Sequence, residues 1–162
     1  MSNLEHASDE RFREWEEALD PYGNDVDKFA RENGLEVKKW YHNLPLWSIG
    51  NTQASDDLDT IWWTIQLGYS ETKKQLSLAA AAWIDTEYDV PDGRVRERTT
   101  TPPEKNFFAT WKKGDPINIQ ELLDTAYKRA TSYTKQDLTV ASASIAGKDG
   151  VTRHYDPHEP IL

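Results

Sequence analysis

The sequence contains no cysteine and a single methionine. Without cysteine the chain has no disulfide framework, no thiol nucleophile and no cysteine-based zinc site, so a reducing compartment is permitted. It also lacks any apolar run long enough to cross a bilayer, and its first residues lack the basic and apolar regions of a signal peptide. We therefore expect a soluble, cytoplasmic protein that does not act at a membrane.

Basic residues are scarce, with 19 Lys and Arg against 28 Asp and Glu, a net charge of −9. Residues 1–60 hold 14 acidic and 6 basic residues, which accounts for −8 of that charge. Such a polyanionic surface repels phosphates, so we expect no nucleic acid ligand and favour a basic protein partner. The one local basic excess, Arg94 to Lys113, is predicted to be an edge strand kept soluble by its charges.

Familiar catalytic and metal-binding signatures are missing as well. The sequence has no phosphate-binding glycine loop, no G-x-S-x-G turn and no H-E-x-x-H motif. His154 and His158 are four residues apart, but Pro157 and Pro160 prevent the helix that would align them. His42, among aromatic residues, is interpreted as a packing residue. We therefore predict no metal and no cofactor.

Aromatic residues are abundant: 7 Trp, 7 Tyr and 4 Phe in 162 residues. This much apolar surface offsets the entropy of ordering a chain that is 29% charged. The length suits one core. We predict a single globular domain over residues 1–162, with mobile ends at 1–7 and 156–162.

The segment from Leu58 to Tyr88 predicts a long β-hairpin, because apolar residues alternate along both of its halves. A four-residue loop, Ser70 to Lys73, would place Leu67 opposite Leu76. The predicted inward residues are Ile61, Trp63, Ile65, Leu67 and Tyr69 on the first strand and Leu76, Leu78, Ala80, Ala82 and Ile84 on the second.

The opposite face of this hairpin carries Trp62 and Trp83 above Ala79 and Ala81. Small residues let a helix approach a sheet closely, so the favoured interpretation is a helix covering this face. The alternative is a shallow aromatic groove for a sugar, base or peptide, because contiguous exposed aromatic residues mark binding sites.

Around the hairpin, the periodicity predicts three helices. The first is capped by Ser8 and ends at Asp20-Pro21; the second is capped by Asn24 or Asp25 and ends at Asn33-Gly34. Asn118 and Glu121 mark the start of a longer helix over 117–134. The predicted fold class is therefore α+β: an antiparallel meander sheet of about five strands, with two N-terminal helices and the 117–134 helix packed on it.

Further strands are predicted from alternation and turn residues. They include 35–42, a short strand ending at Gly50, and 106–111. After the Asp89–Gly93 turn, one register places Arg96 and Arg98 beside Asp85 and Glu87, and a bulged turn places them on the other face; the first is preferred because it pairs opposite charges. Residues 138–145 fit either a small-residue helix or, preferably, a hairpin with 151–155.

Three functional hypotheses follow. The first is a non-catalytic interaction protein, of an inhibitor, immunity-type or assembly-accessory kind, that presents Glu14, Glu16 and Glu17 to a basic partner. The second binds a small aromatic or carbohydrate ligand in a groove formed by four tryptophans: Trp62, Trp83, Trp40 and Trp47. The third is a hydrolase that uses Asp85 and Glu87 beside Arg96, against which stands a simple ion-pair role for these carboxylates. The oligomeric state is not fixed by the sequence.

Overall fold

The computed structural model describes residues 10–51 and 60–155, which form an α+β fold around one antiparallel sheet. The helices are α2 (Glu10–Leu19), α3 (Gly23–Asn33) and α4 (Ile119–Ala130). The eight strands are β1 (Glu36–Lys38), β2 (Leu46–Gly50), β3 (Trp62–Ser70), β4 (Gln75–Val90), β5 (Gly93–Thr100), β6 (Phe107–Lys112), β7 (Thr139–Gly147) and β8 (Thr152–Tyr155).

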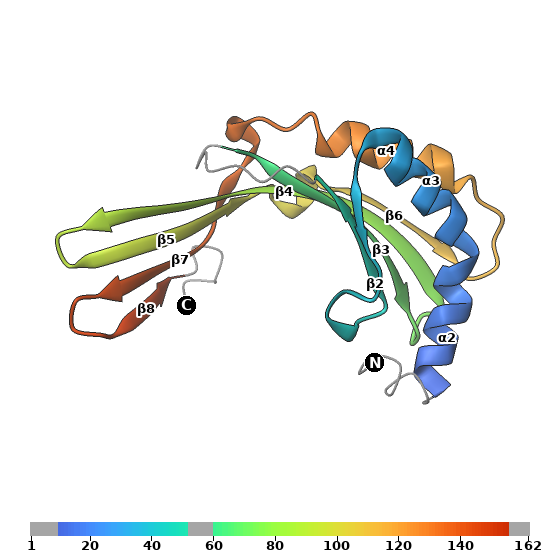
Figure 1. Cartoon of the computed structure of the whole chain (residues 1–162), viewed down its shortest axis with the longest axis horizontal. Helices are drawn as coiled ribbons and strands as arrows, with labels where there is room; N and C mark the ends of the chain where they lie inside the picture. Colours follow the sequence, from blue (N-terminus) through green and yellow to red (C-terminus); the bar gives the residue numbers. More distant parts are fainter. Residues whose placement is uncertain (1–9, 52–59, 156–162) are drawn as a thin grey trace.

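Strand β4 is the central strand of the sheet and pairs with three other strands. One of its edges pairs with β3 as far as Trp83, and its other edge pairs first with β6 and then with β5. The main strand order is β1-β2-β3-β4-β5-β7-β8. Because β4 has 16 residues, it extends beyond the end of β3. Its last residues, together with β5, β7 and β8, project from the part of the molecule that the helices cover (Figure 1). We call this projection the arm and the remainder the body.

Thr101 closes the gap between β5 and β6, where neither strand pairs with Ala82. Its backbone N–H donates to the Ala82 carbonyl at 2.9 Å, and its hydroxyl accepts from the Ala82 N–H at 3.2 Å. The Thr101 side chain also donates to Asn106 Oδ1. Only 3% of Thr101 is exposed, so this residue replaces ladder hydrogen bonds that water cannot supply.

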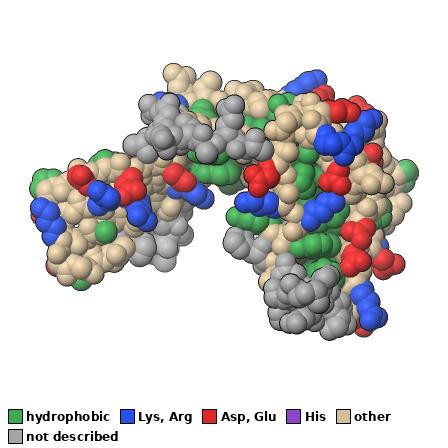
Figure 2. Space-filling model, in the orientation of Figure 1, with side chains coloured by type: hydrophobic (Ala, Val, Ile, Leu, Met, Phe, Trp, Pro, Cys, Tyr) green, Lys and Arg blue, Asp and Glu red, His purple; other side chains and the backbone are tan. Residues whose placement is uncertain are grey.

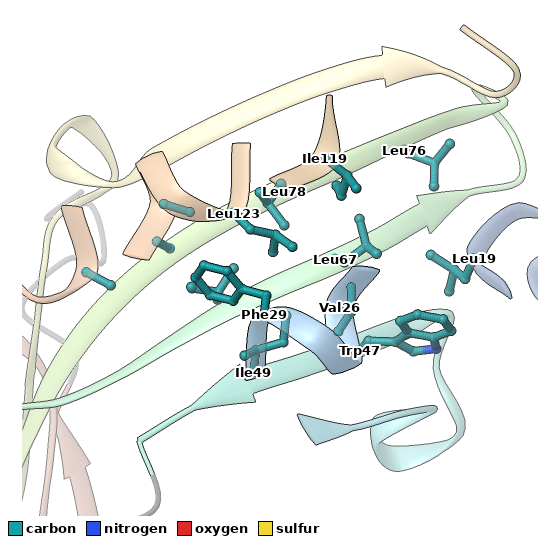
Figure 3. Packing of buried hydrophobic residues seen from close by; sticks show 14 of the residues in the cluster. Leu19, Val26, Phe29, Trp47, Ile49, Leu67, Leu76, Leu78, Ile119 and Leu123 are labelled. Atoms are coloured by element: carbon teal, nitrogen blue, oxygen red, sulfur yellow. The ribbon is translucent and has the colours of Figure 1, made fainter. Parts of the chain in front are cut away.

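The core lies between the three helices and one face of the body sheet (Figure 3). Leu19, Val26 and Phe29 come from α2 and α3, while Ile119 and Leu123 come from α4. They meet sheet residues that alternate along the strands, as a half-buried sheet requires. The largest fully buried sheet residues are Trp47, Ile49, Ile65, Leu67, Leu76 and Leu78.

The predicted hairpin is correct in its faces and wrong in its register. Leu67 lies opposite Leu78, not Leu76, because the loop is Glu71–Lys74 and Ser70 pairs with Gln75. Lys74 has a φ of 53°, a left-handed backbone that closes this loop. A shift of two residues keeps each side chain on its face, since the side-chain period of a strand is two.

Helix α4 does not cover the face of Trp62 and Trp83, as we expected, but the opposite face of the sheet. Its buried residues pack with Leu78, Ala80 and Ala82, on the same side as α2 and α3. No helix in the described part of the chain covers the face of Trp62 and Trp83. The larger apolar residues on the Leu76 and Leu78 face decide the outcome, because burying them removes more apolar area from water than burying alanines.

The helix boundaries follow the predicted signals in part. Asn118 caps α4 by accepting a hydrogen bond from the Glu121 N–H at 3.2 Å, and Gly34 ends α3 with a φ of 66°. The expected cap of α3 by Asn24 or Asp25 is wrong: a single 3-10 turn, Asp20–Tyr22, leads directly into α3 without a side-chain cap. Ser8 lies outside the described residues, as does the tail histidine His158.

The described part of the sheet has eight strands rather than about five, and it is not a simple meander, because β6 and β5 share one edge of β4. β5 is an interior strand between β4 and β7, so the expected edge strand at Arg94 is wrong. The preferred pairing of Arg98 with Asp85 and of Arg96 with Glu87 is confirmed, as is the β7–β8 hairpin. Among the helices described, none has the length and apolar character needed to span a membrane.

Candidate functional site

A groove of about 460 Å³ lies on the sheet face that none of the described helices covers. Trp62 and Trp83 form its apolar part. They are directly opposite each other in the β3–β4 ladder, and both are half-buried. Figure 2 shows hydrophobic side chains gathered in the hollow between the arm and the body, with charged side chains on either side. An indole that remains partly exposed on a sheet face offers a flat surface for a ligand.

Polar side chains surround the two indoles. Thr64 and Gln66 follow Trp62 on the same face of β3, because alternate residues of a strand share a face. Ser48 and Thr64 share a hydrogen bond of 2.9 Å between their hydroxyls. Asn51 Oδ1 accepts from the Trp63 N–H at 3.2 Å, which fixes the end of β2 against β3. The groove therefore combines an aromatic surface with hydroxyl and amide groups.

Arg98 forms the side of the groove towards the arm. Its guanidinium lies 5.5 Å from the centre of the Trp83 ring and donates two hydrogen bonds to Asp85, at 2.7 and 2.9 Å. By accepting these hydrogen bonds, the Asp85 carboxylate stabilises the charged guanidinium and raises the Arg98 pKa above its ordinary value. Asp85 therefore holds this cation against the Trp83 face.

On the opposite side of the groove lie Lys38 and Tyr41. The Lys38 ammonium is 5.8 Å from the centre of the Tyr41 ring and 3.9 Å from Glu36. Tyr41 is held by a short 3-10 turn, which starts from Trp40 in a left-handed backbone conformation with a φ of 58°. This turn places Tyr41 where its side chain lines the groove.

Two of the four predicted groove tryptophans lie elsewhere. Trp47 is fully buried in the core, on the face that the helices cover. Trp40 packs against it with ring centres 6.1 Å apart, and against Phe12 at 4.9 Å. The expected single groove of four tryptophans is therefore wrong, because Trp47 points to the opposite face from its neighbours in β2. Trp62 and Trp83 are the two that the structure brings together.

Asp85, Glu87 and Arg96 lie on one face of the arm, in a row of ion pairs. Glu87 is 3.0 Å from Arg94 and 3.6 Å from Arg96, and both Asp85 oxygens accept from Arg98. A hollow of about 610 Å³ lies beside these residues, near Ser142 and Ser144 of β7. Each of the two carboxylates thus already contacts an arginine, as a simple ion-pair role requires.

The acidic residues of α2 differ in their surroundings. Glu14 accepts a hydrogen bond from the Tyr69 hydroxyl at 2.6 Å and another from Lys74. These two donors lower the Glu14 pKa below its ordinary value, with Lys74 the larger cause. Glu17 is 3.7 Å from Lys113. Glu16 is exposed, and a hollow beside it is lined by Arg13, Glu17 and Asp20.

Within residues 10–51 and 60–155, no group of three His, Asp or Glu side chains could hold a metal ion. Sequence reasoning missed Tyr41, Gln66 and Arg98 as groove residues. Gln66 could have been found from its place two positions after Thr64 on the Trp62 face, whereas Tyr41 depends on a turn geometry that has no clear sequence signal. A search of protein families, of curated proteins and of solved structures finds no match to this chain.

Proposed function

We propose that this chain is a non-catalytic binding protein that holds a small ligand with a flat apolar face, a carbohydrate or an aromatic ring, in the groove of Trp62 and Trp83. One observation carries the proposal: these two indoles are cross-strand partners, half-buried, on a sheet face left open by all described helices. Aromatic surfaces rimmed by hydrogen-bonding groups suit such ligands, because the rings contact the apolar face and the rim fixes the orientation.

The charges of the groove support a neutral ligand. Glu36 accompanies Lys38, and Asp85 accompanies Arg98, so each cation already has a carboxylate partner. The unpaired hydrogen-bonding group nearest the indoles along β3 is the amide of Gln66, which makes no side-chain hydrogen bond within the described part of the chain. An amide both donates and accepts, which suits hydroxyl recognition.

The test is ¹⁹F NMR of protein labelled with 5-fluorotryptophan, with the Trp62 and Trp83 signals assigned from Trp62→Phe and Trp83→Phe. Cellohexaose, chitohexaose and adenosine are titrated separately. We expect one of them to shift both groove signals, with the Trp47 signal as the internal control because Trp47 is fully buried. If none of the three shifts either groove signal at millimolar concentration, the proposal fails.

A second candidate function is the recognition of a basic protein partner through α2. Glu16 and Asp20 favour it: both are exposed, and neither has an ion-pair partner among the described residues. Glu14 and Glu17 contribute less free charge, because Lys74 and Lys113 lie beside them. Retention of a basic protein at low salt, and its loss in the Glu16→Gln, Asp20→Asn double variant, would support this candidate.

A further inference from the structure

Among the described residues, strand β4 has an open edge in the arm. From Ile84 to Val90 it pairs with β5 on one side, and on the other side none of the described strands pairs with it, because β3 begins at Trp62 opposite Trp83. An open edge presents backbone N–H and C=O groups that an added strand can use. This edge projects from the body with the rest of the arm (Figure 1).

The side chains of this edge alternate in character. One face carries three carboxylates at every second position, Asp85, Glu87 and Asp89, whose side chains are 53%, 37% and 77% exposed. The other face carries Ile84, Thr86, Tyr88 and Val90, and Tyr88 is 49% exposed. The edge is therefore amphipathic with the period of a strand.

The arginines that pair with these carboxylates lie one strand further in. Arg94, Arg96 and Arg98 belong to β5, which is enclosed by β4 and β7. Although the three acidic and three basic residues balance, the negative charge lies at the edge and the positive charge behind it. Asp89 contacts Arg94 through Oδ1 at 3.0 Å. A carboxylate can accept about four hydrogen bonds in all, so further donors can approach from the edge.

We propose that the edge of β4 from Ile84 to Val90 binds an extended segment of a partner protein by strand addition, and that this segment carries Lys or Arg at every second position. Its basic residues would lie opposite Asp85, Glu87 and Asp89, while the residues between them contact the Tyr88 face. This site borders the groove of Trp62 and Trp83, because Asp85 also holds Arg98 against the Trp83 ring, but it does not depend on the ligand of the groove.

A second copy of the chain fits this edge less well. If two β4 edges pair antiparallel about Glu87, then Glu87 faces its own counterpart and Asp85 faces Asp89 of the other copy. Like charges directly opposite each other on a sheet are destabilising. The same charges favour a cationic strand, in keeping with the net charge of −9.

The probe is a fluorescein-labelled peptide of seven residues in which lysine and valine alternate, measured by fluorescence anisotropy at 50 mM and 500 mM salt. Two control peptides have the same net charge: one with its lysines in a block, and one with the central valine replaced by proline. We expect the alternating peptide to bind at least about tenfold more tightly than either control. The block peptide loses the alignment of the three charge pairs, and the proline peptide interrupts the backbone ladder.

A matched pair of protein variants locates the site. Glu87→Gln with Asp89→Asn removes two charges at the edge, and Glu16→Gln with Asp20→Asn removes two from α2. The first variant is expected to lower the affinity for the alternating peptide at least about fivefold. The second is expected to change this affinity by less than about twofold. Hydrogen exchange should slow at alternate residues of 84–90 when the peptide is bound, because the amides that face the open edge gain partners while the others already point towards β5.

Several results would overturn the proposal. Equal affinity for the alternating and block peptides would show general charge attraction, and equal losses in the two variants would show that the edge is not the site. Self-association of the free protein that the Glu87→Gln, Asp89→Asn variant alters would identify a second copy as the occupant. If the edge variant does not fold, the two control peptides still decide the result with the unmodified chain.

Discussion

Trp62 and Trp83 are cross-strand partners on the sheet face away from the helices, whereas Trp47 and Trp63 lie on the face that the helices cover. Trp62 and Trp63 are consecutive in sequence and point in opposite directions, because successive side chains of a strand alternate between faces. One pair of neighbouring residues thus supplies both the core and the groove. The indole of Trp62 is less buried than that of Trp63 and therefore contributes less to stability.

This division predicts different stability costs for the tryptophans. Trp47→Ala should lower the free energy of unfolding by about 3 to 5 kcal/mol, because it empties a fully buried site. Trp62→Ala and Trp83→Ala should each cost about 1 kcal/mol, because solvent already reaches part of both rings. Urea denaturation followed by circular dichroism measures all three. A cost for Trp83→Ala equal to that of Trp47→Ala would contradict an open groove.

The sequence patterns predict faces better than pairings. Alternation identifies the side chains of β3 and β4 that face the core, such as Trp63, Leu67 and Ala82, yet the predicted partner of Leu67 is wrong by two positions. The register depends on where the turn falls, and Ser70–Lys73 and Glu71–Lys74 are both polar four-residue loops. Which of the two loops forms depends on the left-handed backbone of Lys74, which the neighbouring residues do not predict.

The position of α4 shows why the candidate site could be predicted only in part. Ala79 and Ala81 suggest close helix packing as strongly as Ala80 and Ala82 do, since both pairs are small. Alternation identified Trp62 and Trp83 as a pair on one face, but whether that face is open depends on which side the chain crosses after β6. The groove position of Tyr41 likewise depends on contacts between segments that are distant in sequence.

Thr101 gives a sharp test of the junction between β5 and β6. Thr101→Val keeps the shape of the side chain but removes the hydroxyl that accepts from the Ala82 N–H. We expect a loss of about 1 to 3 kcal/mol, because a buried N–H is left without a partner. Thr101→Ser, which keeps the hydroxyl, is the control and should lose less than about 1 kcal/mol. Equal losses in chemical denaturation would mean that the methyl group, not the hydrogen bond, matters here.

Glu14 predicts an acid-sensitive contact between α2 and the β3–β4 loop. Its pKa lies below the ordinary value of 4.5 in the folded state, because Lys74 and Tyr69 donate to it. A lowered carboxyl pKa contributes stability above pH 4.5 and loses that contribution as the pH falls through the folded-state value. Glu14→Gln should therefore show a smaller fall in urea midpoint between pH 5 and pH 3 than the unmodified chain.

The matched control for this prediction is Glu16→Gln, on the exposed side of the same helix. It removes the same charge without touching Tyr69 or Lys74, so its urea midpoint should fall with pH as it does in the unmodified chain. If the two variants respond alike, the acid sensitivity comes from the total charge of the chain and not from the Glu14 contact.

Gly93 allows β5 to pair closely with β7 at the tip of the arm. It follows the two-residue Pro91-Asp92 turn, pairs with both Val90 and Gly147, and has a φ of 154°. A Cβ built at Gly93 would lie 2.1 Å from the Ala146 carbonyl oxygen, which belongs to the backbone of β7. Because backbone in a ladder cannot move aside as a flexible side chain can, β5 and β7 must separate there.

Gly93→Ala should consequently raise hydrogen exchange across β7 and β8 while leaving the core strand β3 protected, since the body has its own packing around α4. Gly114→Ala is the control: Gly114 also has a positive φ, of 91°, but nothing lies within 4 Å of a Cβ there. Both variants carry the cost of a left-handed backbone, about 1 kcal/mol, and only Gly93→Ala adds the clash. Protection that is lost equally in β3 and β7 would show that arm and body unfold as one unit.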